Sequence, residues 1–206
     1  MSYSMVIDLK RCVGCSGCVT NCKASNGTSP EMARSWVDRS LEGKYPDARR
    51  SIVPKLCNQC DNPPCILVCP VEDTTFKDDS GVVLIDKELC IGCQSCISAC
   101  PYGARKYRAD AMGYFGSELT QYEEVAYQNM PENTVDKCDF CMGRTPEGQV
   151  PEPACVRSCV AGARFFGTTE EMKGFIDSSG RDSYRLLENM QTEPNVIYLS
   201  DFVNTV

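Results

Sequence analysis

The cysteines of this chain are the residues whose type and spacing best predict a chemistry. Between Cys90 and Pro101, four cysteines are separated by two, two and three residues, and a proline follows the last of them. Bacterial ferredoxins bind [4Fe-4S] cubanes with this spacing, because three thiolates wrap one cluster and the fourth reaches a second. The stretch therefore predicts two clusters by itself. Gly92 lets the backbone curl close to inorganic sulfide, and Pro101 ends the short helix that carries Cys96 and Cys100.

The sixteen cysteines of the 206-residue chain form four groups of four, with none left over. Group one is Cys12, Cys15, Cys18 and Cys22; group two is Cys57, Cys60, Cys65 and Cys69; group three is Cys90, Cys93, Cys96 and Cys100; group four is Cys138, Cys141, Cys155 and Cys159. Each group has enough thiolates for one cubane, so the sequence predicts four clusters and sixteen metal-ligating residues.

Zinc sites and disulfides are the alternative uses of these cysteines. Structural zinc usually takes two separated Cys-x-x-Cys hooks, whereas groups one and three place four cysteines within eleven residues. Group four alone could bind zinc and make the chain a zinc-binding interaction module. Disulfides would need strained pairings and an oxidising compartment. The absence of histidine excludes mixed Cys/His zinc fingers, Rieske centres and c-type haem attachment, so we interpret the groups as cluster sites.

The overall composition indicates an acidic chain without a membrane helix of its own. The formal net charge is −7, and each oxidised cubane with four cysteinates adds about −2, which makes nucleic acid an unsuitable partner. No apolar stretch approaches the roughly 20 residues that a membrane helix needs. The first ten residues show neither a secretory nor a twin-arginine signal. We therefore expect a chain that is soluble by itself.

An internal repeat relates the cysteine groups. The segment 6–8 precedes group one as 84–86 precedes group three, and the same offset of 78 residues relates Gly14 to Gly92. Groups two and four match more loosely, but in both a phenylalanine, Phe76 or Phe166, stands seven residues after the last cysteine. The repeat predicts an α+β fold of two pseudo-symmetric bacterial ferredoxin-like modules, each with two [4Fe-4S] clusters.

The distances between groups suggest how the modules are arranged along the chain. Only 20 residues separate groups two and three, against 34 between groups one and two and 37 between groups three and four. Groups two and three thus form the compact inner pair, although sequential pairing stays possible from the residues alone. The expected parts are an outer module of 1–33 with 132–168, a hairpin insertion 34–56, an inner module 57–108, a connecting loop 109–131, and a C-terminal helix and tail 169–206.

Turn and capping signals predict the elements that position these groups. Residues 74–77 and 82–86 flank an Asp/Gly turn and predict one hairpin, and 34–41 with 51–56 predict another. Residues 109–131 are expected to be loop with some helix. Thr168 and Thr169 can cap a helix that reaches about Ile176, and 196–199 predict a short strand.

Further motifs surround the cysteine groups. They are Met5-Val-Ile-Asp8, Leu56-Cys-Asn-Gln-Cys60 with Pro63-Pro64-Cys65, Cys100-Pro-Tyr-Gly-Ala-Arg105, Val135-Asp-Lys-Cys-Asp-Phe-Cys141, and Pro153-Ala-Cys-Val156 with Gly162-Ala-Arg164. Over nearly the whole chain, this pattern resembles the electron-transfer (beta) subunit of molybdopterin oxidoreductases of the dimethyl-sulfoxide reductase family.

The resemblance implies nested ligation, with four cubanes because Cys93 is kept where some relatives have tryptophan and a three-iron cluster. The implied sets are Cys12, Cys15, Cys18 and Cys159 for cluster 1; Cys138, Cys141, Cys155 and Cys22 for cluster 2; Cys57, Cys60, Cys65 and Cys100 for cluster 3; and Cys90, Cys93, Cys96 and Cys69 for cluster 4.

The chain departs from the family pattern after two of its cysteines. Glu72 and Asp73 follow Cys69 closely, and we expect them to lower the potential of a nearby cluster if they are charged and unpaired. Val160 stands where many relatives have proline, which should loosen that turn without removing a ligand.

Arginines and aromatic residues near the cysteines support weaker hypotheses. The arginines could donate hydrogen bonds to sulfur or dock an acidic partner, or they could simply be solvated and balance an acidic surface. They are Arg105, Arg108, Arg144, Arg157 and Arg164. Trp36, Tyr114 and Phe115 are expected to be packing residues or subunit contacts.

The resemblance implies a non-catalytic subunit that relays single electrons between a molybdopterin catalytic subunit and a quinol-oxidising membrane subunit or soluble redox partner. Related complexes reduce sulfur compounds or arsenate, oxidise formate, or hydroxylate and transhydroxylate phenols, and 113–115 with 122–124 resemble the last group. A free polyferredoxin carrier, or a ferredoxin subunit of a hydrogenase-type complex, is the alternative. The expected location is the cytoplasm or a membrane-bound complex, with periplasmic co-export beside a twin-arginine-signalled partner as the alternative.

Overall fold

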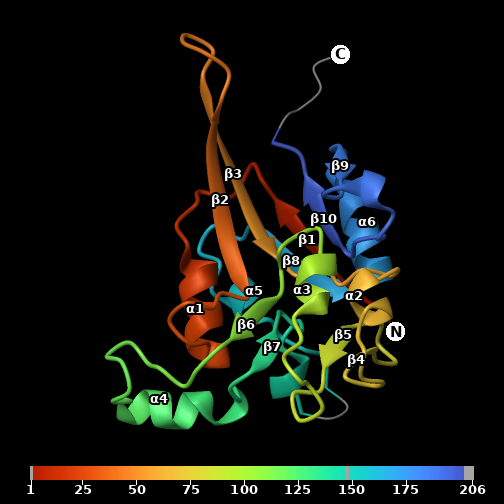
Figure 1. Ribbon diagram of the computed structural model, residues 1–206. Coiled ribbons are helices and arrows are strands. Elements are labelled where there is room, and N and C mark those ends of the chain that lie inside the picture. The colour runs from red at the N-terminus through yellow and green to blue at the C-terminus, as the bar shows by residue number, and fades with distance from the viewer. Residues whose placement is uncertain (1, 147–148, 202–206) are drawn as a thin grey trace.

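The central sheet of the protein brings together strands from the two ends of the chain. In the computed structural model, which describes residues 2–146 and 149–201, the strand order is β8-β1-β10-β9. β1 (Tyr3–Asp8) pairs antiparallel with β8 (Arg164–Thr168) and parallel with β10 (Val196–Leu199), and β9 (Ser183–Tyr184) forms the edge. Figure 1 shows these red and blue strands side by side.

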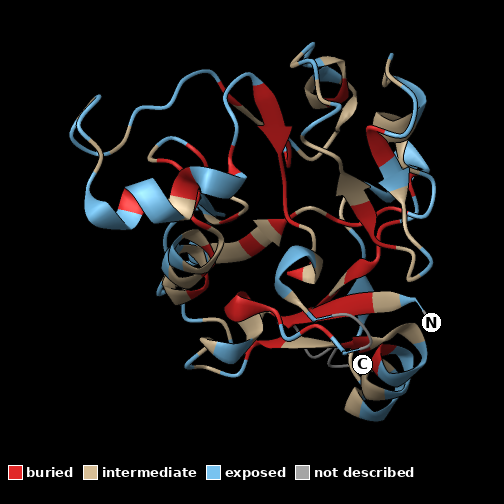
Figure 2. Ribbon diagram, turned by 90° about the horizontal axis from the view of Figure 1, so that it is seen from below, coloured by how far each residue is buried: buried red, intermediate tan, exposed pale blue. Residues whose placement is uncertain are grey.

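Both faces of this sheet are covered, which explains why β1 is buried at nearly every position. Side chains alternate between the faces of a strand, so Met5 and Ile7 enter the main core while Val6 points to the other side. There Val6 packs with Met172 of α6 (Thr169–Ser179). Figure 2 shows buried residues along these strands and exposed residues on the outer face of the helices.

Three two-stranded ladders complete the strand content. β2 (Ser35–Glu42) and β3 (Arg49–Leu56) form a long hairpin that projects from the body of the protein in Figure 1. β4 (Thr75–Lys77) pairs with β5 (Val83–Ile85), and β6 (Lys106–Arg108) pairs with β7 (Thr134–Asp136). The first two ladders confirm the hairpins that the turn signals predict, whereas the β6–β7 ladder has no local signal.

Short helices carry or adjoin the cysteines. They are α1 (Gly17–Asn26), α2 (Pro64–Leu67), α3 (Ser95–Ala99) and α5 (Ala154–Arg157), with a 3-10 turn η2 (Met142–Arg144) after group four's first hook. α1 packs against α5, and α2 packs against α3. Groups one and four therefore meet in one part of the fold, and groups two and three meet in another.

The remaining helices follow the capping signals of the sequence. α4 (Gln121–Ala126), continued by the 3-10 turn η1 (Tyr127–Asn129), lies in the segment expected to be loop with some helix. α6 starts at a capping box of Thr168 with Glu171 and ends at Ser179, three residues beyond the predicted end, with Gly180 as its C-cap. Another 3-10 turn, η3 (Glu188–Met190), precedes the confirmed strand β10. Residues 202–206 of the expected tail lie outside the described ranges.

Within the described residues, no helix combines the length and the apolar character needed to cross a bilayer.

Candidate iron–sulfur cluster sites

The loops of groups one and three share one backbone conformation. Gly14 and Gly92 both have a φ of +68°. The residues that precede α1 and α3, Ser16 and Gln94, are both left-handed, with φ of 62° and 61°. Such left-handed steps make the tight turns that bring successive cysteines to one side of a loop. The two loops thus have the matching local geometry that the offset of 78 residues predicts.

An aspartate forms a tight turn just before each of these loops. Asp8 is buried and Asp86 is half-buried. Asp8 accepts hydrogen bonds from the backbone N–H groups two and three residues ahead at 3.0 and 3.3 Å, and Asp86 does the same at 2.8 and 3.4 Å. Burial tends to raise the pKa of Asp8, but the Arg181 guanidinium 2.7 Å away outweighs burial and leaves this pKa lowered. The repeat therefore includes the turn that starts each loop.

The structure explains the need for glycine at position 92 differently from the sequence, which suggests a close approach of the backbone to sulfide. A Cβ at this position would clash with the backbone carbonyl of Asn133 and approach the Tyr107 ring. At the equivalent Gly14, a Cβ would lie 3.1 Å from the side chain of Ile52 in β3. A backbone segment distant in the sequence therefore excludes a side chain at Gly92, whereas at Gly14 the Ile52 side chain only crowds the position.

All sixteen thiols lie in described segments and are free of disulfide bonds. Thiols of groups one and four lie within electrostatic reach of one another, and the pKa of Cys22 is raised to about 12, first by burial and then by these neighbours. The neighbouring thiols are Cys12 with Cys18 and Cys159, and Cys22 with Cys141 and Cys155.

Thiols of groups two and three are brought together in the same way. Burial raises the pKa of Cys60 to about 12, and three thiols of groups two and three add to this effect. Another set of thiols lines a common cavity together with Arg105. The neighbours are Cys60 with Cys57, Cys65 and Cys100, whereas the cavity is lined by Cys69, Cys90, Cys93 and Cys96.

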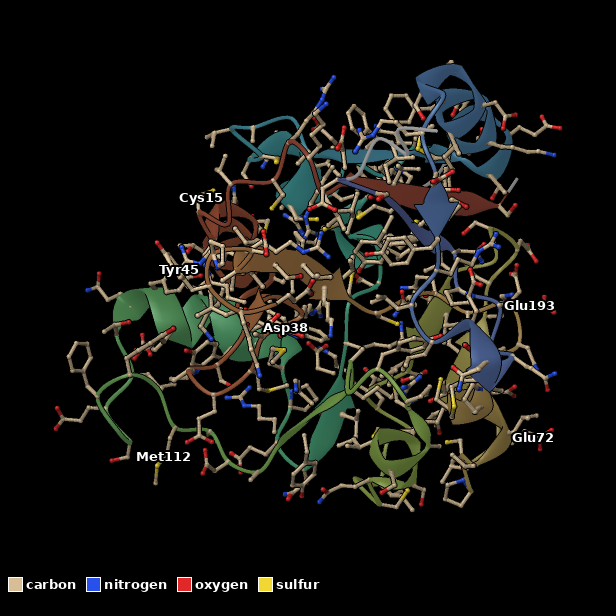
Figure 3. All side chains as sticks on the ribbon, turned by 90° about the horizontal axis from the view of Figure 1, so that it is seen from above. Cys15, Asp38, Tyr45, Glu72, Met112 and Glu193 are labelled. Atoms are coloured by element: carbon tan, nitrogen blue, oxygen red, sulfur yellow. The ribbon has the colours of Figure 1, made fainter. Side chains whose placement is uncertain are left out.

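Thiols of neighbouring sets also lie close enough to influence one another electrostatically. Cys18 lies within electrostatic reach of Cys155, and Cys57 lies within reach of Cys138. Of the sixteen cysteines, only Cys15 and Cys93 are exposed. They occupy equivalent positions in groups one and three, and Figure 3 shows Cys15 on the opposite side of the molecule from Glu72, which lies three residues after Cys69.

Two of the five arginines singled out in the sequence are buried against thiols. Arg105 is 2% exposed and donates a hydrogen bond from Nη2 to the Cys65 sulfur at 3.0 Å. Arg164 is 3% exposed and lies within electrostatic reach of Cys155. The interpretation of these two as solvated arginines is therefore wrong.

The other three arginines have different surroundings. Arg108 is buried but donates to the Asp110 carbonyl and lies over the Tyr127 ring. Arg144 and Arg157 are exposed, and Arg157 pairs with Glu152 at 3.7 Å. These two match the expectation of solvated surface charges.

An ion-pair network that sequence reasoning missed holds the first hook of group four. Arg34 contacts Asp136 at 2.6 Å and Asp139 at 3.1 Å, and Lys87 contacts Asp136 at 3.0 Å. Burial would raise the pKa of Asp136, but Arg34 and Lys87 outweigh it and lower that pKa. Asp139 in turn accepts the Cys141 N–H at 2.9 Å, so the network fixes the loop between Cys138 and Cys141.

Sequence reasoning also passed over Lys137, which lies inside a quoted motif. The side chain is 3% exposed, and its Nζ donates to the carbonyls of Val83 and Cys138. Its position beside a cysteine was the only signal, because burial of a lysine cannot be read from a motif.

The donor set and its surroundings fit anionic iron–sulfur clusters. In the described chain, no carboxylate lies within ion-pair distance of Arg105, Arg164 or Lys137. A buried cation without a counter-charge costs several kcal/mol, and thiolates that carry a cluster would supply that charge. Within residues 2–146 and 149–201, no three Cys, Asp or Glu side chains converge on a point where a single metal ion would be held.

These features define an α+β iron–sulfur protein of the ferredoxin type. Residues 48–114 and 120–169 match the family model described as 4Fe-4S dicluster domain. A tetrathionate reductase subunit of Salmonella typhimurium is 37% identical over 204 residues, which cover 96% of this chain and 72% of that protein.

Two further relatives cover the chain equally well. A selenate reductase subunit of Mesobacillus selenatarsenatis is 36% identical over 217 residues, 97% of this chain and 72% of the relative. The arsenate respiratory reductase iron-sulfur subunit of Shewanella sp. is 32% identical over 231 residues, which cover 98% of this chain and 97% of the relative. The chain belongs to the iron–sulfur electron-transfer subunits of the dimethyl-sulfoxide reductase family.

Proposed function

We propose that this subunit holds four [4Fe-4S] clusters in a row and relays single electrons along them. The packing of α1 against α5 and of α2 against α3 carries this proposal, because it joins group one to group four and group two to group three. The ligand sets are those implied by the family resemblance: Cys12, Cys15, Cys18 and Cys159; Cys138, Cys141, Cys155 and Cys22; Cys57, Cys60, Cys65 and Cys100; Cys90, Cys93, Cys96 and Cys69.

The same packing supports two nested, pseudo-symmetric modules. The outer module comprises 1–33 with 132–168 and the inner module 57–108, while 34–56 and 109–131 link them. The first linker contains the paired strands β2 and β3, and the second lies between the paired strands β6 and β7. Residues 169–206 then close the central sheet through β10, with 202–206 outside the described chain.

The thiol contacts support a linear order of the clusters. Cys18 near Cys155 joins clusters 1 and 2, and Cys57 near Cys138 joins clusters 2 and 3. Arg105 contacts Cys65 of cluster 3 and lies within electrostatic reach of Cys96 of cluster 4. When bound, the clusters would supply the one-electron chemistry, and the protein would set their spacing and potentials.

The two ends of this row are the accessible places where electrons would be exchanged. Cys15 belongs to cluster 1 and Cys93 to cluster 4, and both are exposed. Exposed apolar side chains adjoin these ends, as is usual at interaction sites. They are Val13 and Val160 at cluster 1, and Leu67 and Ile91 at cluster 4.

The partners follow from the relatives, which are subunits of reductases of tetrathionate, selenate and arsenate. The subunit would connect a molybdopterin catalytic subunit at one end with a quinol-oxidising membrane subunit or soluble redox protein at the other. Co-purification tests this assignment. A stable stoichiometric complex with a molybdenum protein supports it, whereas isolation as a lone chain that exchanges electrons with several enzymes would favour a free polyferredoxin.

Ligand substitution tests the nested pairing. Nested ligation predicts that Cys15→Ser and Cys159→Ser abolish the same paramagnetic signal, and that the double variant loses no more than either single variant. Cys22→Ser should affect a different signal. Loss of two different signals in the first two variants would instead support sequential pairing.

A further inference from the structure

Three buried cations lie along the proposed row of clusters, one at each junction. Arg164, Lys137 and Arg105 are 3%, 3% and 2% exposed. Each is held by neutral oxygen or sulfur atoms. Since the side chains do not reach a carboxylate within the described residues, their charge is available to the clusters.

Arg105 lies between thiols of clusters 3 and 4. Its Nη2 donates to the Cys65 sulfur at 3.0 Å, and its charge lies within electrostatic reach of Cys96, which lines the same cavity. Its Nη1 is 3.4 Å from the Thr75 hydroxyl. Cys65 belongs to cluster 3 and Cys96 to cluster 4, so the charge of one guanidinium acts on both clusters.

Arg164 has the corresponding place between clusters 1 and 2. Its charge lies within electrostatic reach of Cys155 of cluster 2 and of Cys18 of cluster 1. Ser35 accepts from Nη2 at 3.0 Å, and the Met5 sulfur lies 4.0 Å from Nη1. Arg105 and Arg164 each stand five residues after the last cysteine of their group.

Lys137 lies at the junction of the two modules. Its Nζ donates to the Cys138 carbonyl at 2.9 Å and to the Val83 carbonyl, and its charge reaches Cys65. Cys138 belongs to cluster 2 and Cys65 to cluster 3. The lysine therefore lies between clusters 2 and 3, where electrons would cross from one module to the other.

We propose that Arg164, Lys137 and Arg105 are tuning residues that raise the reduction potentials of the two clusters beside each of them. A positive charge in a poorly solvated interior stabilises the reduced, more negative state of both neighbours and offsets the repulsion between two reduced clusters. In each step one neighbour loses an electron and the other gains it, while the cation keeps its proton. This inference rests on the proposed four-cluster row.

Redox titration of the intact complex, followed by electron paramagnetic resonance, tests the inference. Arg105→Gln should lower the midpoint potentials of two clusters by at least a tenfold change in their reduction equilibria, about 59 mV for one electron, and leave the other two unchanged. Arg164→Gln should lower a different pair. Lys137→Gln should lower the potentials of clusters 2 and 3, which are one cluster from each of these two pairs.

Charge-preserving and exposed variants make the test specific. Arg105→Lys loses the planar guanidinium fork but keeps the positive charge, so both potentials should stay within about threefold of the wild-type reduction equilibria. Arg157→Gln is a matched control, because Arg157 lies between two ligating cysteines but is exposed and should shift nothing. If Arg105→Gln binds less iron, the lysine variant decides: a fall of two potentials with full iron content would overturn the role of charge.

Two other outcomes separate this inference from the function on which it rests. Unchanged potentials in Arg105→Gln and Arg164→Gln with full iron content would overturn the tuning role and leave the four-cluster row intact. Too little iron in the wild-type complex would instead contradict the four-cluster row itself.

Discussion

Gly14 and Gly92 have the same backbone conformation but different neighbours. The first is covered by Ile52 of the β2–β3 hairpin and the second by the carbonyl of Asn133. The loop sequence predicts the glycine and its tight turn. The neighbour that excludes a side chain comes from a distant segment, so the sequence of the loop could not identify it.

A substitution at Gly92 should therefore damage one cluster loop. Gly92→Ala adds a methyl group at φ +68° and forces it against the Asn133 carbonyl, which costs more than the roughly 1 kcal/mol of the strained φ alone. We expect loss of one cluster's worth of iron. Gly116→Ala is the control, since this glycine has φ +81° with open space around it; equal iron contents in the two variants would contradict the steric account.

Glu72 and Asp73 are exposed charges near a cluster, in contrast to the buried Arg105. Both are exposed in the turn after Cys69, where water screens their charge. Glu72→Gln with Asp73→Asn should raise the potential of one cluster, but by less than Arg105→Gln lowers it. Asparagine suits the positive φ of 58° at Asp73. A redox titration with no change would reject this role for the two acids.

At the scale of elements, the middle of the β2–β3 hairpin contacts the loop of group one. Arg39 of β2 donates to the Gly14 carbonyl and, at 2.7 Å, to the Ser16 hydroxyl. The hairpin thus braces the loop of group one. Its strands were predictable from their turn, but this contact depends on how the hairpin folds back over the loop.

Arg39→Ala should loosen that loop without unfolding the protein. We expect faster loss of one cluster on exposure to air, measured as decay of one paramagnetic signal, because two hydrogen bonds to the loop disappear. Arg50→Ala, at an exposed position on the partner strand, should decay like the wild type. Equal decay in both variants would show that the hairpin does not brace the loop.

The Arg34 network should contribute more to stability than any surface ion pair. Arg34→Ala leaves the buried Asp136 with Lys87 as its remaining ion-pair partner, and breaking a buried pair costs about 3–5 kcal/mol. Lys55→Ala removes a partly exposed pair with Asp38, worth about 0–1 kcal/mol. Guanidinium unfolding of both variants measures the difference; similar midpoints would contradict the importance of this network.

The sequence could predict elements with local signals, but not the pairings between distant segments. The capping box at Thr168 and the two hairpins have all their determinants within a few residues, and their elements were predicted closely. The parallel pairing of β1 with β10 and the β6–β7 ladder join segments whose sequences carry no mark of one another. Burial of Lys137 and Arg34 depends on those pairings and was missed for the same reason.

At the scale of the whole molecule, the fold places sixteen thiols in an acidic chain with few buried counter-charges. Groups from both ends of the sequence meet through α1 and α5, and the inner groups meet through α2 and α3. The exposed Cys15 and Cys93 lie in the terminal sets of the proposed row. This arrangement suits a subunit that receives electrons at one end and delivers them at the other.

Quantitative iron analysis of the anaerobically purified complex, combined with spin counting after full reduction, is the decisive measurement for the four-cluster row. Four [4Fe-4S] clusters should give about sixteen irons per chain and paramagnetic signals from about four centres. About eight irons with two centres, or zinc in place of iron, would contradict the proposed row.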